Sequence, residues 1–236
     1  MFKLTVSPAE IENLELASFP GQIHVISHPG LDFSRAIAYL KKQPLLGFDT
    51  ETKPVFSPGQ PQNKVALLQL SGPDHAYLFR IHKLGLRPRL RAILSNPNII
   101  KVGAASLDDV RGLQHYGAFE ARGFVDLQKI VWEWGIRDKS VKKMAANILG
   151  VRISKSQQLS NWEAETLNAH QQLYAATDAW VCVEMYNKLM QSEKHPLAPE
   201  EMLPPEQLPT GTPSKHGKKH GRKKLRDEKG IPEKGA

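Results

Sequence analysis

Two carboxylates follow an apolar run near residue 45 at a spacing that could hold a metal ion. The run 45–48 continues directly into Asp49 and Glu51. Alternate residues of a β-strand point to the same face, so these two carboxylates are expected to lie together. Two such groups repel each other, and a hard divalent cation would neutralise them. The alternative, which this pair alone leaves open, is a solvated strand end with an aspartate turn.

Two further acidic features lie later in the chain. In the run 101–110 an expected strand leads through small residues into a helix whose first turn carries Asp108 and Asp109. Carboxylates are favoured at a helix N-terminus by the helix dipole without any function. In the last expected helix Tyr174 and Asp178 are four residues apart, which places the phenol above the carboxylate on one face. A buried helical aspartate is costly unless it is paired or metal-bound, but each feature alone is ambiguous.

The elements that would position these residues alternate between strands and helices. Hydrophobic periodicity predicts strands at 23–27, 45–51, 65–70, 76–81, 99–103 and 123–125, and helices at 32–42, 90–94, 107–116 and 169–189. The polar turn at 71–74 suits an antiparallel hairpin. The later strand–helix alternation favours parallel pairing. We therefore expect an α/β fold in which an antiparallel meander continues into parallel strands, with helices flanking a mixed sheet.

Taken together, the acids match the motifs of a known family in order and spacing. The motifs are Phe48-Asp49-Thr50-Glu51, then Asp109 six residues after Gly103, then Tyr174-x-x-x-Asp178. Flanking segments agree as well, at 63–70, 77–79, 154–155, 159–162 and 173–179. From about residue 21 to 189 the sequence resembles the tyrosine-bearing branch of the DEDD superfamily, the ribonuclease D and Werner-type 3′–5′ exonucleases. The resemblance implies a ribonuclease H-like sheet and 3′–5′ exonuclease activity on single-stranded or 3′-recessed nucleic acid.

The resemblance also implies a role for each site residue. Two divalent cations, Mg²⁺ or Mn²⁺, would be held by Asp49, Glu51, Asp109 and Asp178, since all-oxygen ligation favours hard ions. Asp49 would bridge both ions, Glu51 and Asp178 would complete the site that generates the attacking hydroxide, and Asp109 would help to position the second ion. Tyr174 would orient the nucleophilic water, because an ordinary phenol pKa near 10 disfavours a full general base. The in-line displacement would release nucleoside 5′-monophosphates from the 3′ end.

Several basic and aromatic residues are candidate nucleic-acid contacts. Lys155 lies in a loop segment that resembles the family and could contact a substrate phosphate, with simple solvation as the alternative. Trp162 could stack on a base, although interior packing is the more common role of a tryptophan in such a segment. The run 215–226 carries seven of the 32 Lys and Arg residues and no acid, against a formal net charge of +8. It could bind phosphates through counterion release, or merely solvate the tail. The candidate contacts within it are Lys218, Lys219, Arg222, Lys223 and Lys224.

The composition predicts three parts and a cytoplasmic protein. We expect an N-terminal extension at 1–20, the exonuclease domain at 21–192, and a flexible tail at 193–236 that is proline-rich and then basic. No run approaches the roughly 18 apolar residues of a membrane span, so no membrane partner is expected. The single cysteine, Cys182, fits a reducing compartment. No GxxxxGK[ST] phosphate loop occurs, so no nucleotide cofactor is expected.

Two other functional hypotheses stay open at the level of sequence. A catalytically silent nucleic-acid-binding module could keep this fold, because fold does not fix function. The chain could instead be the exonuclease subunit of a larger processing assembly, tethered by its tail. RNA and DNA are both candidate substrates, because no recognisable reader of the ribose 2′-hydroxyl stands out. The sequence does not set an oligomeric state.

Overall fold

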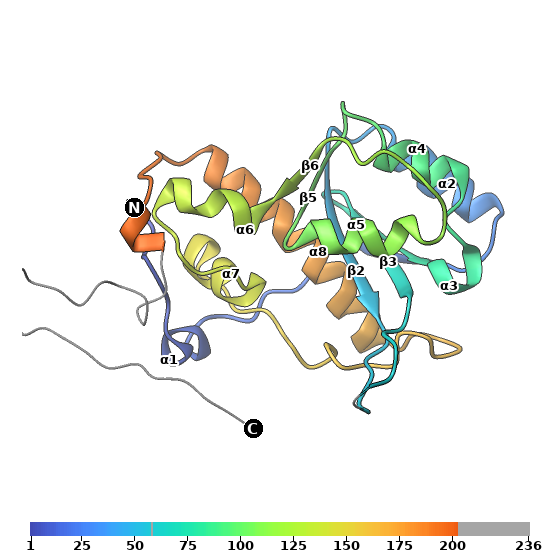
Figure 1. Cartoon of the computed structure of the whole chain (residues 1–236), viewed down its shortest axis with the longest axis horizontal. Coiled ribbons are helices and arrows are strands. Elements are labelled where there is room, and N and C mark those ends of the chain that lie inside the picture. The colour runs from blue at the N-terminus through green and yellow to red at the C-terminus, as the bar shows by residue number, and fades with distance from the viewer. Residues whose placement is uncertain (58, 203–236) are drawn as a thin grey trace, which may run out of the picture. The chain divides into compact units, whose positions relative to one another are not determined.

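A mixed six-stranded sheet forms the centre of the fold (Figure 1). The computed structural model describes residues 1–57 and 59–202, and its strands follow the order β1-β4-β3-β2-β5-β6. Neighbouring strands among β2, β3 and β4 are antiparallel, whereas β1 pairs with β4, and β5 with β2 and β6, in parallel. The predicted mixed α/β sheet is therefore confirmed. The strands are β1 (Gln22–Ile26), β2 (Leu45–Thr52), β3 (Val65–Ser71), β4 (His75–Arg80), β5 (Ile100–Gly103) and β6 (Phe124–Asp126).

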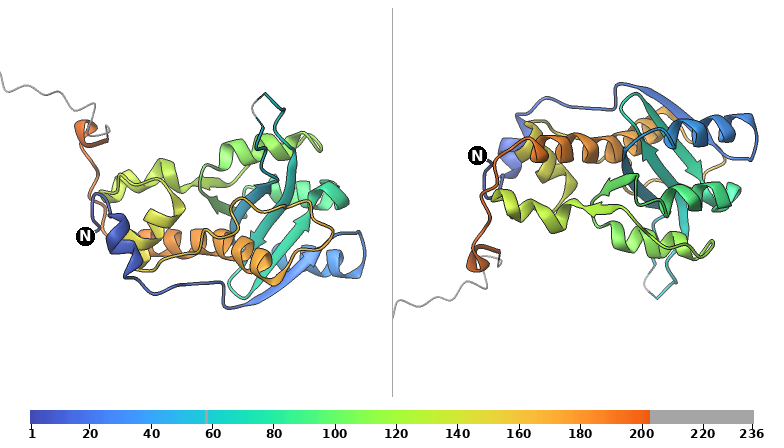
Figure 2. Two further views of the ribbon diagram at one scale, coloured as in Figure 1. Left: turned by 90° about the horizontal axis from the view of Figure 1, so that it is seen from below. Right: turned by 90° about the horizontal axis from the view of Figure 1, so that it is seen from above.

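Helices cover both faces of this sheet. Apolar residues of α2, α4 and α5 share one buried cluster with Phe48 and Leu68 of the sheet. The long helix α8 packs across the opposite face, and Figure 2 shows it on the other side of the strands from α5. The described helices are α1 (Pro8–Glu12), α2 (Leu31–Leu40), α3 (Ile81–Leu84), α4 (Pro88–Leu94), α5 (Ser106–Gln114), α6 (Leu127–Ile130), α7 (Val141–Leu149) and α8 (Ala169–Met190), with short 3₁₀ turns at Val131–Trp134 and Pro199–Met202.

A glycine brings α8 close to the central strand β2. A Cβ atom at Gly47 would lie only 1.9 Å from the carbonyl oxygen of Ala179. Strand and helix therefore meet backbone to backbone at this point. Asp49 and Glu51 share the face of Gly47 because they are two and four residues further along the strand, and Asp178 precedes Ala179 in the helix. Three alanines of α8 are fully buried, as their small size predicts: Ala175, Ala176 and Ala179.

The first twenty residues pack along the domain. Val6 and Ile11 form a small apolar cluster with a residue of α7. Further on, the Ala17 N–H donates to the Arg152 carbonyl at 2.9 Å, and the Phe19 N–H donates to the Thr177 hydroxyl at 3.0 Å. Figure 2 shows this N-terminal segment running beside α8. The expected extension thus contacts both the helix that carries Asp178 and the start of the loop that carries Lys155.

The described part of the chain extends ten residues into the expected tail. Leu197 is buried, and its N–H donates to the Trp132 carbonyl at 3.0 Å. The rest of the expected tail, 203–236, lies outside the described residues, and the bounds of the three parts stay predictions. Across the described residues, no helix has the length and apolarity needed to span a membrane.

Candidate active site

Three carboxylates meet where β2 packs against α8. One oxygen from each of Asp49, Glu51 and Asp178 lies within 4.8 Å of the other two. The strand supplies the first two from alternate positions, and the helix supplies the third from the turn beside Gly47. Carboxylate oxygens gathered at this separation are the ligand set of a hard divalent cation. The structure therefore brings together three of the four predicted metal ligands, which we call the carboxylate cluster.

Burial raises the pKa of every member of the carboxylate cluster. The pKa of Asp49 lies well above its usual range because of burial and then the charges of its neighbours. Burial, followed by the charges of Asp178 and Asp109, raises the pKa of Glu51 to about 9. Burial raises the pKa of Asp178 to about 7, against the opposing effects of the Tyr174 hydroxyl and the Lys155 charge. A divalent cation would remove this electrostatic cost, so the donor set and its environment fit a metal site.

Asp109 lies beside the carboxylate cluster and is held separately. The Thr50 hydroxyl donates a hydrogen bond to the Asp109 carboxylate, from the face of β2 opposite to Asp49. Burial raises the pKa of Asp109 to about 6. Its helix α5 begins after Ala105, which adopts a left-handed conformation with φ 59°, an arrangement that costs roughly 1–3 kcal/mol in a residue other than glycine. The adjacent Asp108 is exposed and pairs with Arg111 at 3.0 Å.

Tyr174 is positioned as a hydrogen-bond donor to Asp178. Its side chain is 9% exposed, and burial followed by the nearby carboxylate charges raises its pKa above the ordinary value of a phenol. The hydroxyl therefore keeps its proton. The Trp162 ring packs against it with 6.0 Å between ring centroids.

Trp162 itself has no exposed surface. This burial argues against base stacking and agrees with interior packing, the role that the sequence favoured, because a fully enclosed ring offers no face to a nucleotide. Its neighbourhood explains the burial. Arg80, also buried, donates to the carbonyls of Ala164 and Glu165 and so fixes the loop that carries Trp162.

Lys155 is exposed at the edge of the carboxylate cluster. It lines a hollow of about 260 Å³ together with the three clustered carboxylates and Tyr174. Its charge is close enough to lower the pKa of Asp178. The other predicted contacts lie outside the described residues: Lys218, Lys219, Arg222, Lys223 and Lys224.

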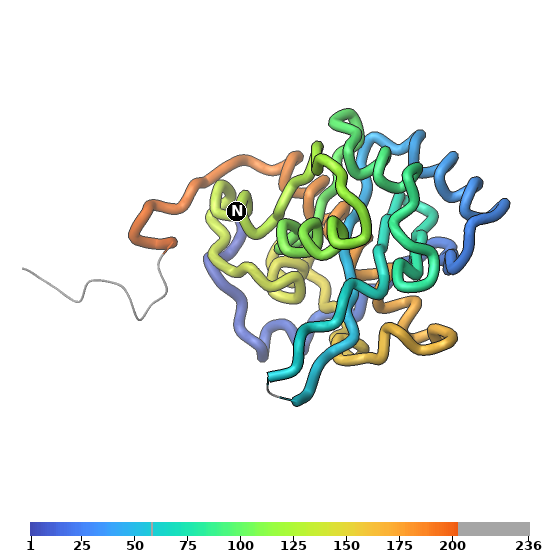
Figure 3. Tube along the Cα trace, turned by 45° about the vertical axis from the view of Figure 1, so that its right-hand side comes forward, coloured from blue at the N-terminus to red at the C-terminus, as the bar shows by residue number. Residues whose placement is uncertain are grey.

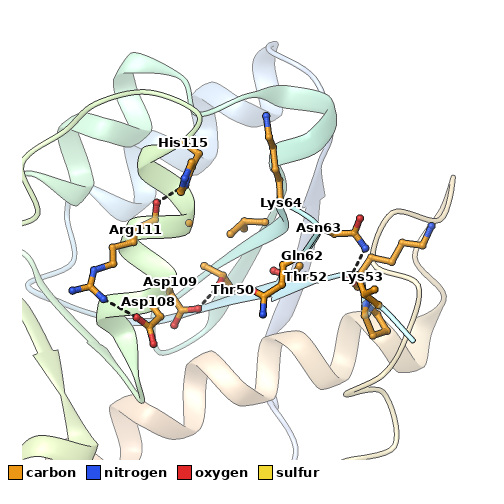
Figure 4. Close-up of a pocket in the computed structure, with 14 residues that line it drawn as sticks. Thr50, Thr52, Lys53, Gln62, Asn63, Lys64, Asp108, Asp109, Arg111 and His115 are labelled. Carbon is orange, nitrogen blue, oxygen red and sulfur yellow. Dashed lines mark hydrogen bonds and ion pairs between the residues drawn. The ribbon is translucent and has the colours of Figure 1, made fainter. Parts of the chain in front are cut away.

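A larger groove of about 800 Å³ opens on the opposite face of β2 (Figure 4). Thr50 and Asp109 lie at one end of it, joined by their hydrogen bond. Its walls are α5 and the described parts of the loop between β2 and β3, which Figure 3 shows projecting from the end of the sheet. Lys53, Lys64 and Arg111 contribute positive charge. Sequence reasoning missed this groove because its two walls are about fifty residues apart in the chain.

Comparison with known proteins agrees with this architecture. The model of the 3′–5′ exonuclease family matches residues 29–193. The chain is 31% identical over 193 residues to the mouse protein named bifunctional 3′–5′ exonuclease/ATP-dependent helicase WRN, covering 75% of this chain and 13% of that protein. It is 36% identical over 149 residues to the Drosophila melanogaster exonuclease 3′–5′ domain-containing protein 2, covering 61% and 25%. This chain therefore spans between about an eighth and a quarter of these curated relatives.

Two solved structures share the fold. Escherichia coli RNase D superposes with a TM-score of 0.63 at 24% identity, over 72% of this chain and 44% of that one. The EXO domain of Aedes aegypti Nibbler superposes with a TM-score of 0.62 at 23% identity, over 74% and 91%. The chain belongs to the 3′–5′ exonuclease family. Membership confirms the predicted class, a nuclease among the hydrolases, and the ribonuclease H-like fold.

Proposed function

We propose that this protein is a divalent-metal-dependent 3′–5′ exonuclease that removes nucleoside 5′-monophosphates from single-stranded or 3′-recessed nucleic acid. The observation that carries the proposal is the carboxylate cluster of Asp49, Glu51 and Asp178, half-buried and mutually repulsive, in a fold that belongs to this family. A merely structural role does not account for three acids packed together whose charges repel one another. We also propose a cytoplasmic compartment, which the single cysteine favours.

The side chains of the site would have different roles in such a reaction. Asp49, Glu51 and Asp178, with Asp109 alongside, would hold two cations, Mg²⁺ or Mn²⁺. When bound, the cations would activate the attacking water and stabilise charge on the phosphate. The hydroxyl of Tyr174, which keeps its proton, would orient that water by a hydrogen bond.

Charged residues on both sides of the site would grip the substrate. Lys155 lies next to the carboxylate cluster, where it would contact the scissile phosphate or its neighbour. On the other face of β2, the groove would receive adjoining nucleotides, with Lys64 against a phosphate. Lys64 lies over the Tyr116 ring and has no ion-pair partner among the described residues, so its charge is available. The basic run 215–226 would add a salt-sensitive contact.

The proposal is tested by a time course on 5′-labelled RNA and DNA of matched sequence, single-stranded or 3′-recessed, with Mg²⁺, Mn²⁺ or EDTA. We expect a ladder that shortens from the 3′ end only with metal. Asp49→Asn should abolish it, because it removes a residue that would hold the cations, whereas the control Glu12→Gln changes an exposed acid of α1 and should leave it intact. Metal-dependent degradation that persists in Asp49→Asn would contradict the assignment. Binding without degradation under any metal would favour a catalytically silent module.

A further inference from the structure

The side-chain amide of Gln69 is buried without a hydrogen bond. Gln69 lies in β3 with no exposed surface. Within the described residues, neither its amide nitrogen nor its amide oxygen has a hydrogen-bond partner. Burying an unpaired amide costs free energy, and most buried polar groups in proteins are paired. A fully enclosed amide of this kind therefore needs a physical explanation.

Strand pairing places this amide beside the carboxylate cluster. Gln69 is directly opposite Asp49 in the antiparallel pair of β2 and β3, and opposite Leu78 on β4. Directly opposed residues project from the same face with Cβ atoms roughly 4.5–5.5 Å apart. Leu67, Leu78 and Ala175 belong to a buried cluster on this face, whose polar atoms are those of Trp162 and Tyr174. Asp49 is thus the polar neighbour that the sheet gives to this amide.

The carboxylates of the site differ in the donors that hold them. Asp109 accepts a hydrogen bond from the Thr50 hydroxyl, and the Tyr174 hydroxyl lies close enough to Asp178 to lower the pKa of that carboxyl. Asp49 accepts one from the backbone N–H of Thr50, and no side chain of the described region donates to it. Carboxylates that bind metals are usually themselves oriented by hydrogen bonds. The residue with the proposed bridging position therefore lacks a side-chain donor, while an unpaired donor lies across the sheet from it.

We propose that Gln69 is a positioning residue for the metal site, whose amide nitrogen donates a hydrogen bond to the Asp49 carboxylate when divalent cations are bound. The inference rests on the proposed function. This donor would fix the orientation of the carboxylate that both cations share and would so raise metal affinity. In the metal-free protein the same amide is unpaired and lowers stability. The amide of Gln69 would thus favour metal binding but disfavour folding of the metal-free protein.

Gln69→Met tests the effects of the amide on metal affinity and on stability, because methionine has a similar length and shape but no amide. We expect the affinity of the full chain for Mg²⁺, measured by titration calorimetry, to fall roughly 10- to 100-fold. The Tm of the metal-free protein should rise, since the unpaired amide is gone. The matched control is Leu70→Met, which alters the next residue of β3, buried on the opposite face against Phe48 and Tyr77. It should leave Mg²⁺ affinity unchanged.

A measurement on the unaltered protein keeps the inference testable even if Gln69→Met folds poorly. In ¹⁵N-labelled full-length protein, adding Mg²⁺ should move one of the two side-chain amide protons of Gln69 downfield, as a new hydrogen bond forms. Unchanged Mg²⁺ affinity in Gln69→Met, or a Gln69 amide signal that does not respond to Mg²⁺ while the wild-type protein binds it, would overturn the inference. Failure of the wild-type protein to bind Mg²⁺ or Mn²⁺ would instead overturn the proposed function on which it rests.

Discussion

The metal-free protein should lose stability as the pH rises from 5 to 8. Burial raises the pKa of Asp178 from 3.8 to about 7, so across this range the folded state retains a proton that the unfolded chain has released. A pKa raised by folding gives a contribution that is fully present below the unfolded pKa and is lost as the pH rises to the folded pKa. Asp109, with a pKa of about 6, and Glu51, with a pKa of about 9, act with the same sign.

The magnitude can be worked from Asp178 alone. Each pH unit between the unfolded and folded pKa removes about 1.4 kcal/mol, so the two units from pH 5 to about 7 remove about 3 kcal/mol. For a chain of this length that is roughly 6–12 °C in Tm. His24 acts in the opposite direction, because burial lowers its pKa. The comparison of wild type with Asp178→Asn therefore isolates the carboxylate.

The assay is thermal unfolding of the full chain in EDTA at several pH values, for wild type, Asp178→Asn and the control Glu12→Gln. At pH 8 the Asp178→Asn protein should have the higher Tm, and its Tm should fall less from pH 5 to 8. Glu12→Gln should follow wild type, because that side chain is exposed and far along the chain from the acids of the site. Mg²⁺ should raise the wild-type Tm more at pH 8 than at pH 5, since protons compete for the ligands. Equal pH slopes for wild type and Asp178→Asn would refute the reasoning.

The remaining predictions concern rate and binding. Tyr174→Phe removes a hydrogen bond worth roughly 1.5–3 kcal/mol to a charged group, so single-turnover kcat should fall roughly 10- to 150-fold if the hydroxyl orients the water. A larger fall in kcat, up to roughly 10⁴-fold, would indicate that the Tyr174 hydroxyl takes part in proton transfer. No fall would indicate that Tyr174 only packs in the interior. Lys64→Gln should lower the slope of log K against log[salt] for single-stranded substrate by about 0.7, the value for one lost phosphate contact. An unchanged slope, equal to that of the exposed control Lys42→Gln, would remove Lys64 from the substrate path.

Local periodicity is why so much of the fold could be predicted. Strand alternation places Asp49 and Glu51 on one face, and helical spacing places Tyr174 beside Asp178; both relations hold within a few residues. The structure confirms the sheet that these elements build. The choice of Asp109 over Asp108 agrees with their burial, since Asp108 points outward to Arg111.

What the sequence could not give depends on segments far apart in the chain. The Thr50–Asp109 hydrogen bond joins residues 59 positions apart, and the Gln69–Asp49 pairing depends on the register of two strands. A one-residue slip in register would turn every side chain of a strand to the other face, so no local pattern fixes such pairs. For Trp162 the sequence favoured packing over base stacking but could not show its partners. Its loop is held by Arg80 from a distant strand, and the ring is fully buried.

Alternation along β2 places the proposed metal site and the proposed substrate groove on opposite faces of one strand. Asp49 and Glu51 face α8, while Thr50 between them faces α5 and ends at the groove through Asp109. The carboxylate cluster forms only if α8 approaches β2 closely enough for Asp178 to lie beside Asp49 and Glu51. That approach depends on Gly47, because any Cβ there would meet the helix backbone at 1.9 Å. A larger residue at 47 would push α8 away and separate Asp178 from Asp49, so this glycine determines the geometry of the site although it contributes no ligand.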